Sequence, residues 1–99
     1  MKIPKKIQIA GKTIDIARDD NYLASNGLIG ESRADQDIIT VPTEKTHFSK
    51  QCIEQTLIHE CVHKINAILS LGSPFNDESY VNPLSEMLYQ VFKQIEGSK

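Results

Sequence analysis

The first half of the chain alternates apolar and polar residues, which is the period of a β-strand with one buried face. Isoleucines take every second position on both sides of Gly11-Lys12, so this stretch predicts a β-hairpin with a two-residue turn. Residues 18–27 are polar and rich in turn formers, and they predict a loop. Residues 28–32 and 37–41 predict a second hairpin, whose last strand ends at Pro42.

In the second half the apolar residues recur every three or four positions, which is the period of an α-helix. Ser49 is a suitable N-cap for a first long helix, and Gly72 with Pro74 predicts its end. Asn82-Pro83 predicts the start of a last helix, which Gly97 closes. The apolar stripe of the first helix, centred near Ile65, comprises Ile53, Leu57, Ile58, Cys61, Val62, Ile65, Ile68 and Leu69. That of the last helix comprises Leu84, Leu88, Val91, Phe92 and Ile95.

Four strands followed by two helices indicate an α+β domain. We expect a small antiparallel sheet of about four strands, made of two hairpins and packed on the two helices. A length of 99 residues fits one domain, residues 1–99. A net charge of −2 and the lack of a basic run give no reason to expect a nucleic acid partner. No apolar stretch approaches the roughly 20 residues that span a bilayer, so no membrane partner is expected.

The two cysteines bear on the cellular compartment. Cys52 and Cys61 lie nine residues apart, and on one helix this separation is about 13 Å. A disulfide needs Cα atoms within about 7 Å, so we expect two free thiols. Free thiols suit a reducing cytoplasm, and the N-terminus lacks the continuous apolar core of a secretory signal.

The most informative motif is H-E-x-x-H, present here as His59-Glu60-Cys61-Val62-His63. On a helix, residues i and i+4 share a face, so two imidazoles can bind one Zn²⁺ while Glu60 acts on a water held by the metal. The histidines lie off the predicted apolar stripe, with Thr56 and Asn66 beside them. The alternative is two histidines on a solvated helix face without metal. The pair uses two of only three histidines in the chain, which favours the metal.

A catalytic zinc site needs a third protein ligand. Glu86, 23 residues after His63, lies off the apolar stripe of the last helix and is the first candidate. Its alternative is a carboxylate that favours a helix N-terminus through the macrodipole. Glu78 in the connector is the next candidate, and His47 is a third.

Other side chains have possible supporting roles. Ligating histidines usually donate their second N–H to an acceptor, for which Gln90 and Asn66 are candidates. Candidates for a further donor to the oxyanion are Tyr89, Tyr80 and His47. Cys61 and Met87 fall on apolar positions, so both are interpreted as core residues.

Four segments together carry a resemblance to a known family. They are residues 2–12, Gly27-Leu28-Ile29-Gly30-Glu31, residues 55–65 around the motif, and residues 84–92. At this spacing they resemble a family of small phage and prophage proteins with a zincin-like, minimal metallopeptidase domain. The resemblance covers nearly the whole chain and implies a zincin-like fold with the motif on the first long helix. The chain departs from the family at Asn82-Pro83, which interrupts the acidic and small residues that commonly lead into the last helix.

In gluzincin-type members of that group, the motif histidines and a downstream helical glutamate bind zinc. The resemblance therefore implies one zinc per chain, held by His59, His63 and Glu86, with Glu60 as general base. It also implies a peptide or protein substrate and the cytoplasm of a bacterial host. Zincins bind substrate along a sheet edge, for which residues 37–41 are the expected strand. The alternative function is a non-catalytic zinc-binding interaction or regulatory domain that keeps the site.

Overall fold

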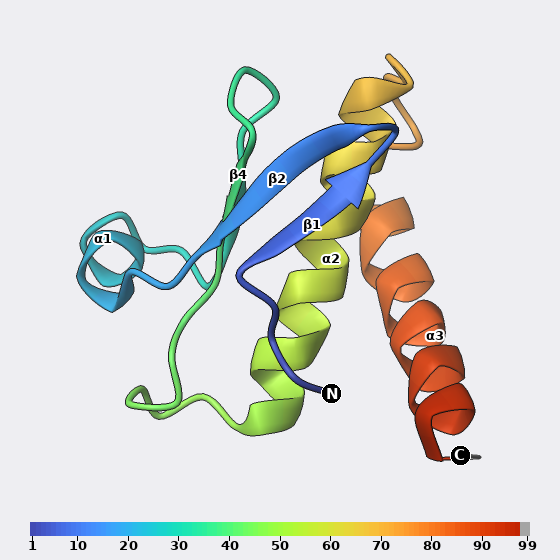
Figure 1. The fold of residues 1–99 in the computed structure, drawn as a ribbon. Helices are drawn as coiled ribbons and strands as arrows, with labels where there is room; N and C mark the ends of the chain where they lie inside the picture. The colour runs from blue at the N-terminus through green and yellow to red at the C-terminus, as the bar shows by residue number, and fades with distance from the viewer. Residues whose placement is uncertain (98–99) are drawn as a thin grey trace.

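The long helix α2 covers one face of a four-stranded sheet, and a second long helix, α3, lies beside α2 (Figure 1). The computed structural model describes residues 1–97. Its strands are β1 (Lys6–Ile9), β2 (Lys12–Ala17), β3 (Glu31–Ser32) and β4 (Ile38–Thr40). Its helices are α1 (Asp20–Ser25), α2 (Lys50–Ile68) and α3 (Glu78–Gly97). The α+β class is confirmed.

The sheet is mixed, so the expectation of an antiparallel sheet was wrong. The strand order is β1-β2-β4-β3, and both expected hairpins are present as antiparallel pairs. The two hairpins meet through β2 and β4, which run parallel, with Ile16 opposite Ile39. The turn of a hairpin is encoded locally, whereas the contact between hairpins depends on how the chain crosses the sheet between residues 17 and 38. Sequence periodicity carries no information about that crossing.

The turn of the first hairpin lies one residue earlier than expected. Lys12 pairs with Ile9, so Ala10 and Gly11 form the two-residue turn. Both have positive φ, 53° and 79°, as a type I′ turn requires. Ala10 adopts the left-handed region despite its Cβ because the strand pairing on both sides fixes the turn.

Residues 18–27, expected as a loop, contain the short helix α1. Asp19 caps this helix by accepting a hydrogen bond from the Tyr22 amide, and Leu23 is the buried residue of the helix. The carboxylate of Asp20 accepts hydrogen bonds from the amide and hydroxyl of Thr43. Six residues are too few to produce a periodic pattern, so this helix depends on its cap and its contacts.

Both long helices differ from the expectation at one end. Ser49 caps α2 as expected, accepting from the Cys52 amide at 3.0 Å. The helix ends at Ile68, before Gly72, because Ser70 already has a φ of 58°. Helix α3 begins at Glu78, not Asn82, and therefore contains Pro83. The earlier start moves Glu78 from a connector onto a helix.

The core lies between the sheet and α2 and includes Ile14, Ile16, Ile39, Val41 and Leu57. The α2 stripe was not centred correctly, since Ile65 is 40% exposed and Leu69 60%. Cys61 packs against the core as expected, whereas Met87 is 57% exposed and is not a core residue. No helix within residues 1–97 is both long enough and apolar enough to span a membrane.

Polar groups replace part of the expected α2 stripe. Lys64 is fully buried, and its ammonium donates to the backbone carbonyls of Arg33 and Gln36. These bonds attach the turn between β3 and β4 to α2. A lysine therefore occupies the buried face that the hydrophobic pattern assigned to isoleucines.

Candidate metal centre

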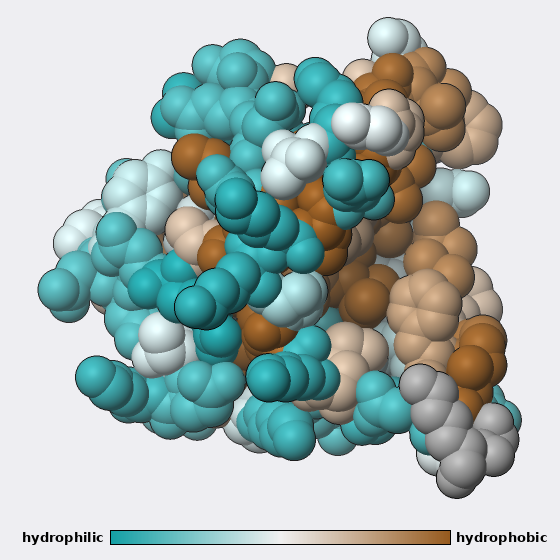
Figure 2. Space-filling view, in the orientation of Figure 1, coloured by the Kyte–Doolittle hydropathy of each residue, from teal (hydrophilic) through white to brown (hydrophobic). Residues whose placement is uncertain are grey.

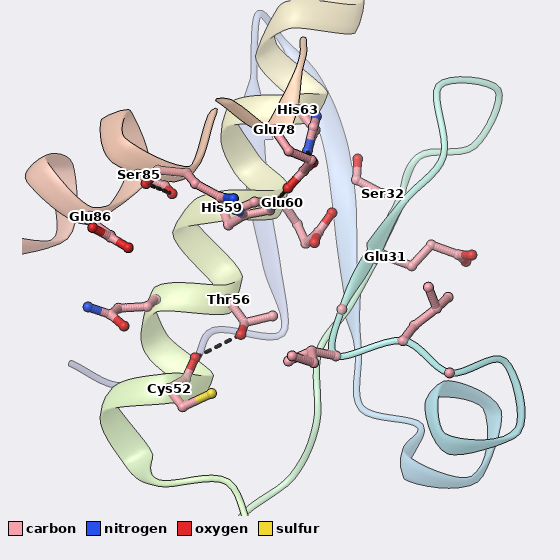
Figure 3. Close-up of a pocket in the computed structure, with 16 residues that line it drawn as sticks. Glu31, Ser32, Cys52, Thr56, His59, Glu60, His63, Glu78, Ser85 and Glu86 are labelled. Atoms are coloured by element: carbon pink, nitrogen blue, oxygen red, sulfur yellow. Dashed lines mark hydrogen bonds and ion pairs between the residues drawn. The ribbon is translucent and has the colours of Figure 1, made fainter. Parts of the chain in front are cut away.

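A cavity of about 620 Å³ opens between the β3 edge of the sheet, α2 and α3. Its size is within the usual range for small-molecule and peptide sites. Figure 3 shows the motif residues on α2 in the middle of it, with α3 on one side and β3 on the other. The lining residues are Gly27, Leu28, Ile29, Gly30, Glu31, Ser32, Cys52, Gln55, Thr56, His59, Glu60, His63, Glu78, Asn82, Ser85 and Glu86.

Both motif histidines point their Nε2 atoms at one carboxylate, that of Glu78. The distances are 3.1 Å from His59 Nε2 to Glu78 Oε2 and 2.7 Å from His63 Nε2 to Glu78 Oε1. One ligand atom from each of the three residues lies within 4.8 Å of the others. The first turn of α3 thus meets the middle of α2 at the motif.

The two candidate carboxylates of α3 lie differently. Glu78 belongs to the group, whereas Glu86 lines the same cavity without belonging to it. In Figure 3, Glu86 lies farther along α3, apart from His59 and His63. The structure therefore brings the second carboxylate candidate, Glu78, to the two histidines, and not the first candidate, Glu86. The reason is the early start of α3, which places Glu78 in its first turn.

These donors fit a zinc ion. Zinc takes imidazole nitrogens at about 2.0–2.1 Å and carboxylate oxygens at about 2.0–2.2 Å, so ligand atoms of a tetrahedral site lie roughly 3.3 Å apart. The Glu78 oxygens are already close to that distance from both nitrogens. Burial lowers the pKa of His59, although Glu78 acts in the opposite direction. A lowered pKa keeps the imidazole neutral, which is the form that binds metal.

The orientation of His63 is set by Asn76, which no sequence pattern singles out. Asn76 Oδ1 lies 2.7 Å from His63 Nδ1, which assigns a proton to Nδ1 and leaves Nε2 for a metal ion that it would share with Glu78. Asn66, an expected acceptor, instead donates to the Phe75 carbonyl at 2.6 Å. It therefore holds the turn that carries Asn76. Gln90, the other expected acceptor, lines a separate hollow.

Glu60 is buried beside the histidines, with 8% of its surface exposed. Burial raises its pKa to about 7; the nearby His63 lowers the pKa, while Glu78 and Glu31 raise it. A carboxyl group whose pKa is close to neutrality can both accept and release a proton at physiological pH. The same burial raises the pKa of Cys61 to about 11, so its thiol is not poised to bind metal.

Gly30 and Ser32 form the wall of the cavity opposite α2. A Cβ on Gly30 would overlap the Thr56 methyl and lie 3.2 Å from Glu60 Oε2, so glycine lets the chain pass close to the motif. The buried hydroxyl of Ser32 has no hydrogen-bond partner among residues 1–97. Glu31, the other residue of β3, also lines the cavity and accepts a hydrogen bond from the Tyr22 hydroxyl.

The expected oxyanion donors lie elsewhere. Tyr89 donates its hydroxyl to buried Glu54 at 2.6 Å. Tyr80 contacts Phe75 edge to face, and His47 packs against Phe48. None of the three candidates is among the residues that line the cavity. Both cysteines are free, as expected.

The strand at the cavity is β3, not the strand expected from the sequence. Residues 37–41 contain β4, which lies between β2 and β3 and has no free edge. Strand β3 pairs only with β4 in the sheet, and its residues line the cavity. Its outer edge is therefore the one on which an extended peptide can pair.

Comparisons with family models, with curated proteins and with solved structures found no significant match to this chain. The functional argument therefore depends on the residues of the site.

Proposed function

We propose that this chain is a zinc-dependent metallopeptidase of the small, zincin-like type found in phages and prophages. Two histidines and a glutamate from two helices converge beside a buried glutamate, in a cavity bordered by a sheet edge, and this observation carries the proposal. His59, His63 and Glu78 are the proposed ligands of one zinc ion. The two free thiols agree with action in the cytoplasm of a bacterial host.

A zinc ion held there would polarise the scissile carbonyl and lower the pKa of a water ligand toward about 7. Glu60 then accepts the proton of the attacking water and delivers it to the leaving amine. Its raised pKa suits both halves of this transfer, because the protonated and ionised forms are both populated near neutrality. Asn76 keeps His63 in the required tautomer.

The substrate is an extended peptide or protein segment. Main-chain pairing along β3 would hold it across the motif with little dependence on its side chains. Because Gly30 has no side chain, the strand that would bind the substrate lies close to Glu60.

The first test is metal content. Protein purified without a histidine tag should contain about one zinc per chain by elemental analysis. The variant His59→Ala should contain little. Metal-free wild-type protein that also fails to take up added zinc would refute the proposal.

The second test is Glu60→Gln, which removes the proton acceptor and keeps the volume of the side chain. We expect cleavage of an unfolded protein substrate to fall at least about 100-fold while zinc content stays unchanged. Glu44→Gln, an exposed carboxylate outside the cavity, is the matched control. If wild-type protein binds zinc but cleaves no unfolded substrate, the site is a non-catalytic zinc site, which is the alternative function.

A further inference from the structure

The most apolar face of α3 is not the face that α2 covers. The buried residues of α3 are Val81, Ser85 and Tyr89, which lie four residues apart on one side of the helix. The apolar face, defined here by Leu84, Leu88, Val91 and Ile95 with Met87 and Phe92 beside them, is half-buried or exposed. Met87 is 57% exposed and Ile95 58%. A helix this amphipathic normally buries its apolar side.

The apolar face continues onto the neighbouring helix. Ile65 and Leu69, near the end of α2, are 40% and 60% exposed. Figure 2 shows brown residues gathered along α3 and over the upper part of α2, whereas the rest of this side is mostly teal. Apart from Tyr22, Ile29 and Ile38, the exposed large apolar residues belong to the end of α2, to α3 and to the connector between these two helices.

The spacing on α3 identifies the kind of partner. Leu84, Leu88, Val91 and Ile95 follow one another at intervals of four, three and four residues. This is the a/d repeat with which one helix packs against another in a coiled coil. The face therefore suits a second helix.

The positions of the charged residues on α3 favour the same helix of a second copy as the partner. Glu78 contacts the motif histidines and Glu86 lines the cavity, while Lys93 and Glu96 pair with each other. All four charged residues of the described part of α3 thus lie outside the repeat, and Met87, Phe92 and Gln94 flank the repeat instead. Two copies can meet there without bringing like charges together. A membrane surface would instead favour several basic residues around the face.

The area is also sufficient. If a large apolar side chain offers about 200 Å² at full exposure, the six most exposed residues of this side present roughly 600 Å². These six are Ile65, Leu69, Met87, Val91, Phe92 and Ile95, at 40–60% exposure. A standard interface buries roughly 800 Å² per partner, of which a little more than half is apolar.

We propose that α3 packs against α3 of a second copy of this chain, through this apolar face, in a two-fold symmetric dimer. Because a two-fold axis brings the same face of both copies together, each residue of this face is buried in both copies. The cavity lies on other sides of α2 and α3 and stays open in the dimer.

Sedimentation equilibrium of the full chain over a concentration series tests the proposal. Wild-type protein should reach about twice the mass of one chain, both with zinc and with a chelator. Val91→Glu places a carboxylate from each copy in the interface and should weaken association at least about tenfold. Gln90→Glu adds the same charge at the adjacent, exposed position outside the repeat and should leave association unchanged.

Circular dichroism checks that each variant is folded, and Ile95→Lys replaces Val91→Glu if the latter unfolds. Wild-type protein that stays monomeric at every concentration overturns the proposal. So does a dimer that survives both interface variants, or an equal loss with Gln90→Glu. Monomeric protein that binds vesicles of anionic lipid would assign the face to a membrane instead.

Discussion

At the scale of single residues, Gly30 and Lys64 show how the wall of the cavity is kept in place. Gly30 has no side chain where β3 approaches α2, and Lys64 holds the turn after β3 to the same helix. Neither residue has a chemical role in the proposed reaction. Both set the distance between Glu60 and the strand on which the substrate would lie.

Replacing Gly30 by alanine should be costly. The new methyl would overlap the Thr56 methyl and crowd Glu60, so one of them must move. We expect the free energy of unfolding to fall by about 1–3 kcal/mol and turnover to fall with it. Chemical denaturation measures the first effect and a cleavage assay the second.

Two comparisons control this result. Gly72→Ala changes a glycine with no atom within 4 Å of the new Cβ, and it should shift stability by less than about 0.5 kcal/mol. Thr56→Ser removes the obstructing methyl and should recover part of the loss when combined with Gly30→Ala. Equal stability of the Gly30 and Gly72 variants would contradict the close approach of β3 to α2.

At the scale of elements, the site depends on where α3 begins. The motif on α2 supplies two imidazoles and Glu60, and the third ligand of the proposed zinc ion would come from the carboxylate that α3 brings to them. The observed start at Glu78 puts that residue, and not Glu86, within 3.1 Å of both Nε2 atoms. Asn76 lies two residues before Glu78, in the connector that leads into α3, and it orients His63.

Alanine substitution of each carboxylate separates the two candidates. At a zinc concentration of 100 times its dissociation constant, wild-type protein should gain about 2.7 kcal/mol of stability. Glu78→Ala should lose most of this gain, whereas Glu86→Ala should keep it. Thermal unfolding with and without zinc measures both. The reverse result would restore Glu86 as the ligand, as the family resemblance implied.

At the scale of the whole molecule, the connection after β2 ties the two halves of the chain together. Asp20 at the start of α1 accepts two hydrogen bonds from Thr43, which follows β4. The side-chain and backbone bonds of Thr43 lower the pKa of Asp20, whereas burial raises it. Arg18 and Lys45 lower it further.

This lowered pKa predicts how stability depends on pH. Because the folded state holds the Asp20 proton more weakly than the unfolded state, its contribution is complete above the unfolded pKa of about 3.8. The contribution disappears as the pH falls through the lower folded pKa. Asp20→Asn should therefore be less stable than wild type at neutral pH and equal to it in acid.

Denaturant unfolding across the pH range checks this expectation. Asp35→Asn, whose side chain is 72% exposed, is the control and should follow the wild-type profile. A constant difference between Asp20→Asn and wild type at all pH values would show that the lost hydrogen bonds do not depend on ionisation.

The sequence by itself determined the features that depend on neighbouring residues. These are the two hairpins, the Ser49 cap, the helix that carries the motif, and the pairing of His59 with His63 on one face. Each follows from periodicity or from a cap within a few positions, so the pattern of side chains is sufficient to predict it.

Only the tertiary structure decided the features that join distant segments. These include the parallel contact of β2 with β4, the exposed edge of β3, and the apolar face of α3. Glu78 and Asn76 meet His63 because the turn after α2 reverses the chain, and Lys64 is buried because two carbonyls meet its ammonium. Hydrophobic periodicity could identify neither the contacts of His63 nor the burial of Lys64. It records which side of a helix is apolar and not which element covers that side.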